Sequence, residues 1–183
     1  MLDPSIDSRD PALLDPDFRA KLDQLLAACE VGGAKFVVDA TVRGPAVQAR
    51  IWCQSRTLSE ITEARGRLTR EGAPRLAALL LASYALTGPC VTHALPGESW
   101  HEFGTAADCF LEVNGSAVWS SPLYLSVYAE EAVKLGLTAG ALWPKPKTDL
   151  DHVQASAFGS PLDEPGASWA TIEARLATMY SLA

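Results

Sequence analysis

Apolar residues recur at helical spacing in the first part of the chain and then give way to short β-branched runs. From Asp15-Pro16 to Gly32-Gly33 the pattern predicts a helix, because proline suits the first helical turn and glycine commonly follows the last. The run 35–42 is short and β-branched, which is typical of a strand. Gly44-Pro45 interrupts it, and a second helix is expected over 46–54.

A long, mostly apolar stretch follows at 58–86 and predicts helices with a break at Gly72-Ala73-Pro74. Its second part, 76–86, is apolar on nearly every side, so we expect it to be buried. That run is too short to cross a bilayer. We interpret 58–87 as a helical insertion that shapes either a substrate cleft or a partner surface.

The remainder of the chain predicts short strands joined by turns, with Asn114-Gly115 as a hairpin turn. Strands are expected at 90–94, 106–113, 117–119 and 151–155. Helices are expected over 124–135 and, within the terminal segment 160–183, over 168–182, with a loop over 138–148. Because strands and helices do not alternate regularly, the fold class expected is α+β, with a small, largely antiparallel sheet flanked by helices.

Composition fits one globular domain spanning 1–183, of which the first 14 residues are expected to be flexible. The apolar fraction is 48% and the charged fraction 20%, which is ordinary for a folded domain. The net charge of −7 disfavours nucleic acid and anionic lipid as partners. The N-terminus has neither the basic region nor the apolar core of a secretory signal.

The four cysteines are Cys29, Cys53, Cys90 and Cys109, and none of them forms a Cys-x-x-Cys pair. This spacing argues against a cysteine zinc site. We expect free, mostly buried thiols. A contact between Cys90 and Cys109 across neighbouring strands is left open.

Two of the three histidines stand near carboxylates at spacings that suit a metal. Two histidines and one carboxylate form the ligand set of a catalytic zinc with one position open to water. His101, Asp108 and His152 are therefore candidate zinc ligands. Asp149, just before His152, is a candidate base for the water. The alternative is that Asp108 caps a turn and His152 is an ordinary packed residue.

Four segments carry motifs in a fixed order. Residues 36–48 (FVVDATVRGPAVQ) contain Arg-x-x-x-x-Gln, and 51–57 (IWCQSRT) end in Gln-x-Arg-Thr. Residues 91–108 (VTHALPGESWHEFGTAAD) contain Ser-x-His-x-x-Gly-x-Ala-x-Asp, and 136–154 (GLTAGALWPKPKTDLDHVQ) end in Asp-x-x-His-x-Gln. Together they resemble the zinc D-Ala-D-Ala carboxypeptidase and L-alanyl-D-glutamate endopeptidase family, which cuts peptidoglycan and includes phage endolysins. The resemblance implies that family's fold, which Hedgehog domains share.

The resemblance assigns roles to the candidate residues. His101, Asp108 and His152 match the family's zinc ligands, and Asp149 matches its general base. Arg43 matches the arginine that assists catalysis near the substrate carbonyl, where a guanidinium would stabilise an oxyanion. A surface salt bridge is the alternative for Arg43.

Other positions match the family less closely. Gln48 and Ser99 match positions that line the site, although Gln48 could be a polar helix residue and Ser99 could only orient the loop of His101. His93 stands where the family usually has Asn, and we expect it either to support the metal ligands or to contact substrate, because a fourth ligand would close the open position on the metal. Gly44 replaces the serine after the arginine, and Leu150-Asp151 replaces an aromatic-proline pair. By strand alternation, Asp151 should point away from the face that carries His152.

The resemblance implies a zinc peptidase that hydrolyses the peptide stem of peptidoglycan. An L-alanyl-D-glutamate endopeptidase is expected first, because the motifs at 43–48 and 54–57 look like the endolysin branch. D-Ala-D-Ala carboxypeptidase activity is the alternative, as is a zinc-binding module without activity. We expect a monomer made in the cytoplasm that reaches the cell wall after release or by another export route.

Overall fold

The computed structural model describes residues 1–182, and the contacts of the chain group it into two compact units. The sheet unit combines residues 8–42 with residues 103–157 and holds the β-sheet. The helical unit combines residues 1–7 and 43–102 with the segment that begins at Phe158. A single domain spanning 1–183 stays a prediction.

The sheet unit is built around one long strand, β2 (Ala106–Val113), to which three other strands pair. The three are β1 (Phe36–Ala40), β3 (Ser116–Val118) and β5 (His152–Gln154), and the sheet also contains β4 (Thr138–Ala139). β5 pairs with the beginning of β2 and β3 with its end, while β4 pairs with β5. Every one of these described pairings is antiparallel, so the predicted α+β class with a small antiparallel sheet is confirmed.

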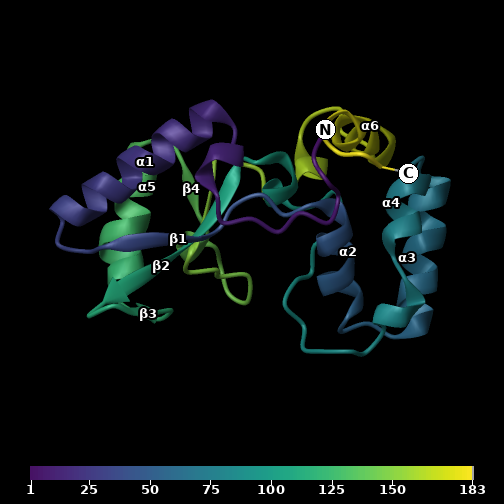
Figure 1. Cartoon of the computed structure of the whole chain (residues 1–183), viewed down its shortest axis with the longest axis horizontal. Coiled ribbons are helices and arrows are strands. Elements are labelled where there is room, and N and C mark those ends of the chain that lie inside the picture. Colours follow the sequence, from purple (N-terminus) through teal and green to yellow (C-terminus); the bar gives the residue numbers. More distant parts are fainter. Residues whose placement is uncertain (183) are drawn as a thin grey trace. The chain divides into compact units, whose positions relative to one another are not determined.

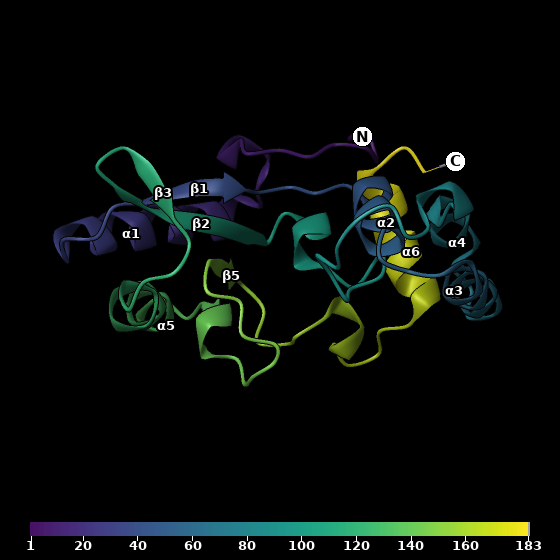
Figure 2. The same cartoon turned by 90° about the horizontal axis from the view of Figure 1, so that it is seen from below.

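Two helical segments complete the core of the sheet unit, and Figures 1 and 2 show both beside β1 and β2. Helix α1 (Pro16–Val31) buries Leu22, Leu25 and Cys29 completely, and the Asp15 carboxylate caps its first turn. A π-helix, η4 (Tyr124–Ala129), continues into α5 (Glu130–Lys134). The rings of Tyr124 and Tyr128 lie 5.1 and 4.6 Å from that of Phe36, which joins η4 to β1.

The helical unit gathers α2 (Pro45–Cys53), α3 (Leu58–Arg70), α4 (Pro74–Leu79) and α6 (Trp169–Met179), as Figures 1 and 2 show. α3 begins with a capping box, because Thr57 Oγ1 accepts the N–H of Glu60 while the Glu60 carboxylate accepts the N–H of Thr57. α4 is tied to α6 by the N–H of Leu76, which donates to the buried carboxylate of Glu173 at 2.9 Å.

Short helical turns connect these elements. They are η1 (Pro11–Leu13), η2 (Ala82–Tyr84), η3 (Trp100–Phe103), η5 (Gly140–Leu142) and η6 (Pro161–Asp163). The turn η3 carries His101, and η5 comes directly after β4. The two turns therefore lie within the motif segments 91–108 and 136–154, which contain the candidate zinc ligands.

The first residues of the chain, which we expected to be flexible, are hydrogen-bonded to α2. The N–H of Gly44 donates to the carbonyl of Ile6 at 2.7 Å, and the N–H of Ala46 donates to that of Pro4 at 2.9 Å. A Cβ atom at Gly44 would collide with the Pro4 carbonyl. The N-terminal segment thus gives a physical reason for glycine where the resembled family has serine.

Several element predictions are confirmed, among them α1, the strand 106–113 and the hairpin turn at Asn114-Gly115. The strand predicted at 90–94 is wrong, because Gln48 rather than a neighbouring strand binds the carbonyl of Ala94. The helix predicted through 86 ends at Leu79, and Leu86 is 68% exposed. The loop predicted at 138–148 contains β4 and η5.

Among residues 1–182, no helix combines the length and the apolar character needed to span a bilayer. The four cysteines are free thiols, as expected. Cys90 is exposed and lies outside any strand, whereas Cys109 is buried in β2.

Candidate metal centre

The pairing of β2 with β5 brings two candidate ligands together. In the antiparallel register Asp108 is the direct partner of His152, although 44 residues separate them in the chain. Asp108 Oδ1 lies 3.0 Å from His152 Nδ1. Directly opposed residues in a sheet point to the same face, so the strand register itself sets this contact.

A glutamine fixes the orientation and the tautomer of His152. Gln154 Nε2 donates to the carbonyl of Ser156 at 2.8 Å, which leaves Gln154 Oε1 facing His152 Nε2 at 3.0 Å. An amide oxygen only accepts hydrogen bonds, so Nε2 carries the proton. The lone pair of His152 is then on Nδ1, the atom that faces Asp108. This is the usual arrangement of a metal-ligating histidine, which donates its second nitrogen to an outer acceptor.

His101 supplies the third candidate ligand. His101 is only 3% exposed and His152 only 7%. The ligand atoms offered by His101, Asp108 and His152 all lie within 4.8 Å of one another. The sequence prediction named this same group from motif and residue type.

The donor set of this group fits zinc. Two imidazole nitrogens and one carboxylate oxygen are the protein ligands of many catalytic zinc ions, which keep a fourth position for water or substrate. Without an ion, a proton must sit between His152 Nδ1 and Asp108 Oδ1 to make their contact favourable. A cation held by both atoms would take the place of that proton.

A buried glutamate organises the turn that carries His101. Glu102 is fully buried, and its carboxylate accepts the N–H groups of Gly97, at 2.8 and 2.9 Å, and of Ser99, at 3.2 Å. The hydroxyl of Tyr180 donates to the Glu102 carbonyl at 2.8 Å. Burial raises the pKa of Glu102 to about 8, against the opposing effects of these N–H groups and of Arg43.

The candidate base Asp149 is exposed and stands next to His152 and Asp151. The carboxyl group of Asp149 is close enough to affect the pKa of Asp151. Burial, the interaction with the Asp149 carboxyl and the charges of Asp108 and Asp149 raise the pKa of Asp151 to about 7. Burial lowers the pKa of His152, but the hydrogen bond and charge of Asp108, with help from Asp149 and Gln154, raise it above its usual value.

Gly140 allows the segment that carries Asp149 and His152 to approach η5 closely. A Cβ atom at Gly140 would lie 2.5 Å from the Asp149 carbonyl oxygen and 3.1 Å from the His152 Cβ. These distances leave no room for a side chain, so glycine is required here by packing. The Trp143 ring, 5.2 Å from that of His152, covers the imidazole near the same turn.

Arg43 and Gln48 lie together in the helical unit. Arg43 Nη1 is 3.5 Å from Gln48 Oε1, and the N–H of Arg43 donates to the carbonyl of His101 at 3.3 Å. Gln48 is fully buried, and its amide donates to the carbonyl of Ala94 at 2.7 Å. Gln48 therefore holds the backbone at Ala94 in place, whether or not it also contacts a ligand.

The two remaining candidates have different surroundings. His93 is exposed. Ser99 is half-buried and hydrogen-bonds to Glu102 through its backbone N–H and carbonyl. Those backbone bonds are consistent with the interpretation that Ser99 orients the loop of His101. The substrate roles of His93, Ser99 and Gln48 stay predictions.

Sequence reasoning missed Gln154, Glu102 and Gly140. Gln154 stands two residues after His152 in the quoted motif, so strand alternation could have placed it on the same face. A glutamate inside an apolar loop gives no comparable signal, because its partners are backbone N–H groups. The contact that requires Gly140 depends on tertiary packing alone.

No protein-family profile matches the chain, and no curated protein sequence matches it. Among solved structures it is similar to a mutant of the vancomycin-resistance D,D-pentapeptidase VanY, from a VanB-type resistance cassette, in complex with Zn(II). The two share 17% identity with a TM-score of 0.48, over 78% of this chain and 73% of the other.

Proposed function

We propose that this protein is a zinc peptidase that hydrolyses a peptide bond in the stem peptide of peptidoglycan. The observation that carries the proposal is the grouping of His101, Asp108 and His152 within 4.8 Å, with Asp149 beside the last of them. The ordered motifs around these residues support the substrate class, because they resemble a family that cuts peptidoglycan.

His101, Asp108 and His152 would hold the zinc ion through two nitrogens and one oxygen. When bound, zinc supplies Lewis-acid polarisation of the peptide carbonyl and acidifies water at its open position. The protein contributes fixed ligand positions. Gln154 holds the His152 ring, and the turn that Glu102 organises carries His101.

Asp149 is assigned the role of general base and then of general acid. Its carboxylate accepts a proton from the attacking water as the new C–O bond forms, and delivers it to the nitrogen of the amine that leaves when the C–N bond breaks. The exposure of Asp149 suits a group that must meet water and substrate. Arg43 would stabilise the negative oxygen that develops on the carbonyl.

Within this proposal, the L-alanyl-D-glutamate bond is the first candidate for cleavage. The segments Arg43–Gln48 and Gln54–Thr57 support it, because they are similar to the endolysin branch of the resembled family. A carboxypeptidase would instead release D-alanine from the end of the stem. Mass spectrometry of fragments released from a defined sacculus separates the two, since only the endopeptidase exposes a new D-glutamate amino group.

The decisive experiment compares Asp149→Ala with Asp151→Asn in the zinc-loaded protein. Asp149→Ala should lower hydrolysis of sacculi about 100- to 10,000-fold, the usual contribution of general acid–base catalysis, while zinc content stays intact. Asp151→Asn is the matched control, because it alters the neighbouring carboxyl and should leave most of the activity.

Two outcomes would contradict this assignment. Loss of zinc from Asp149→Ala would make that residue a ligand rather than a base. A wild-type protein that binds zinc yet releases no fragments from sacculi, with or without chelator, would indicate a binding module without peptidase activity.

A further inference from the structure

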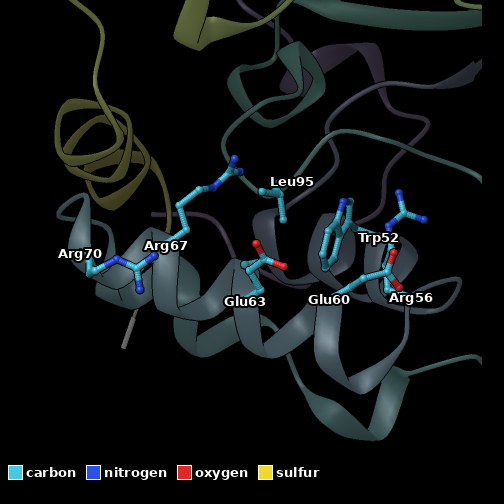
Figure 3. A pocket seen from close by; sticks show the side chains of 8 residues that line it. Trp52, Arg56, Glu60, Glu63, Arg67, Arg70 and Leu95 are labelled. Carbon is cyan, nitrogen blue, oxygen red and sulfur yellow. The ribbon is translucent and has the colours of Figure 1, made fainter.

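The helical unit contains a hollow of about 270 Å³ beside α2 and α3, which Figure 3 shows from close by. Its lining combines apolar and charged side chains: Trp52, Arg56, Glu60, Glu63, Ala64, Arg67, Arg70 and Leu95. The volume lies near the small end of ligand sites. It suits one side chain or one amino acid rather than a whole substrate.

The apolar part of the hollow is rigid. Trp52, Ala64 and Leu95 are between 4% and 8% exposed, so each is fixed by the core of the helical unit. The Arg56 guanidinium lies 5.0 Å from the centroid of the Trp52 ring and donates to the carbonyl of Thr92. The tryptophan thus has a defined orientation in the wall of the hollow.

The charged part of the hollow presents both signs on one helix. Glu63 and Arg67 are four residues apart on α3, a spacing at which such side chains usually pair. In Figure 3 both point to the same side of the helix. Among residues 1–182, however, Glu63 and Arg67 do not form an ion pair with each other. The Arg67 guanidinium instead lies 5.7 Å from the ring centroid of Trp169.

The other charges at the rim have partners or point elsewhere. Glu60 is occupied by the capping box with Thr57. Arg56 is occupied by Trp52 and Thr92. Arg70, one turn after Arg67, adds positive charge near the end of α3. Glu63 and Arg67 remain as a pair of opposite charges on α3, although Arg67 also lies over the Trp169 ring and its charge lowers the pKa of Glu98.

The basic character of this region is local. Residues 50–75 carry six arginines and three glutamates, within a chain whose net charge is −7. A polyanion such as nucleic acid would meet the carboxylates of Glu60 and Glu63 as well as the arginines, so it fits poorly. A ligand with one positive and one negative group matches both Glu63 and Arg67.

We infer that this hollow binds a diamino acid unit, whose ammonium group pairs with Glu63, whose carboxylate pairs with Arg67 and whose aliphatic chain covers Trp52 and Leu95. Many stem peptides of peptidoglycan contain a diamino acid, and the identification of the ligand as part of the wall rests on the proposed function. The binding itself needs only the residues of the helical unit.

The test uses three small probes that contain no bond for a peptidase of this kind to cut. Nα-acetyl-lysine carries both charges, Nα,Nε-diacetyl-lysine keeps only the carboxylate, and Nα-acetyl-lysine amide keeps only the ammonium group. Each is titrated into the zinc-loaded, ¹⁵N-labelled full chain, and the indole N–H signal of Trp52 is followed by NMR. We expect the doubly charged probe to bind more tightly than either blocked form.

Removing a charge from the protein should weaken binding only of those probes that carry the opposite charge. Glu63→Gln should weaken Nα-acetyl-lysine about 2- to 5-fold, the range of exposed ion pairs, yet leave the diacetyl probe unchanged. Arg67→Gln should weaken the probes with a carboxylate by a similar factor and leave the amide unchanged. Arg65→Gln on the same helix is the matched control, because Arg65 does not line the hollow.

Equal binding of all three probes would overturn the inference, as would an equal effect of Arg65→Gln and Arg67→Gln. Tighter binding of inorganic phosphate than of Nα-acetyl-lysine would show a simple anion site instead. None of these results depends on hydrolysis. If the probes bind as expected but the protein does not hydrolyse sacculi, only the proposed function is refuted. If the protein hydrolyses sacculi but the probes do not bind as expected, only the inference is refuted.

Discussion

At the scale of single residues, Gln154 is the side chain whose removal should report most directly on the metal centre. Gln154→Leu leaves His152 Nε2 without its acceptor, so the ring can rotate and its tautomer is no longer fixed. Loss of such an outer partner typically lowers metal affinity about 10- to 100-fold. Competition with a chromophoric chelator measures the zinc dissociation constant.

Gln54→Leu is the control for this variant. It also removes a glutamine hydrogen bond, from Nε2 to the carbonyl of Pro89 at 2.9 Å, but one that involves no ligand histidine. Zinc affinity should be unchanged in that protein. Unchanged affinity in Gln154→Leu would mean that the amide does not set the tautomer of His152.

The identities of the ligands could be predicted from sequence because their chemistry is carried by residue type. Few side chains bind zinc, and the chain has only three histidines. The supporting residues could not be predicted in the same way. Glu102 acts on backbone N–H groups, which every residue possesses, and nothing in the local sequence identifies Gly97 and Ser99 as its partners.

At the scale of elements, the approach of η5 to the segment before β5 determines where Asp149 and His152 lie. Gly140→Ala should push this segment away, because the added Cβ would stand 2.5 Å from the Asp149 carbonyl oxygen. Overpacking of this kind costs about 1–3 kcal/mol. We expect lower stability in urea unfolding together with weaker zinc binding. Gly159→Ala is the control, since its Cβ would meet only Asp163 Oδ2 at 3.6 Å, and an equal loss in both variants would contradict the prediction.

Element prediction succeeded where local sequence determines structure and failed where tertiary contacts do. β2 was predicted to the residue because Gly104 separates it from the preceding loop and the turn formers Asn114-Gly115 end it. The two residues of β4 carry no comparable pattern, and they form a strand only because β5 lies beside them. The apolar run 80–86 appeared helical, but the helix ends at Leu79.

At the scale of the whole molecule, three buried or half-buried groups predict how stability depends on pH without metal. Asp151 and Glu102 have ordinary pKa values of 3.8 and 4.5, and their pKa values rise to about 7 and about 8 in the folded chain. The pKa of His152 also rises. A raised pKa means that the folded chain binds the proton more tightly, so the stabilisation is complete below the unfolded pKa and is lost as pH rises through the folded value. The metal-free protein should therefore lose stability between about pH 4 and about pH 8.

Zinc should reverse this trend. The ion needs His152 Nδ1 and the Asp108 carboxylate without protons, so its affinity increases as pH rises. At free zinc 100-fold above the dissociation constant, binding adds about 2.7 kcal/mol to the free energy of unfolding. Thermal unfolding at several pH values, with zinc and with chelator, measures both slopes. Parallel slopes would contradict a site that exchanges protons for metal.

The register of β2 and β5 also has a consequence for biosynthesis. Asp108 meets His152 only because Ala106, Ala107 and Asp108 pair with the last strand of the sheet. A nascent chain that has emerged only through β2 already carries two of the ligand residues, but it lacks the strand that opposes Asp108. Zinc can therefore be captured in its final geometry only after the segment that contains His152 has left the ribosome and paired, so acquisition of the metal comes late in synthesis.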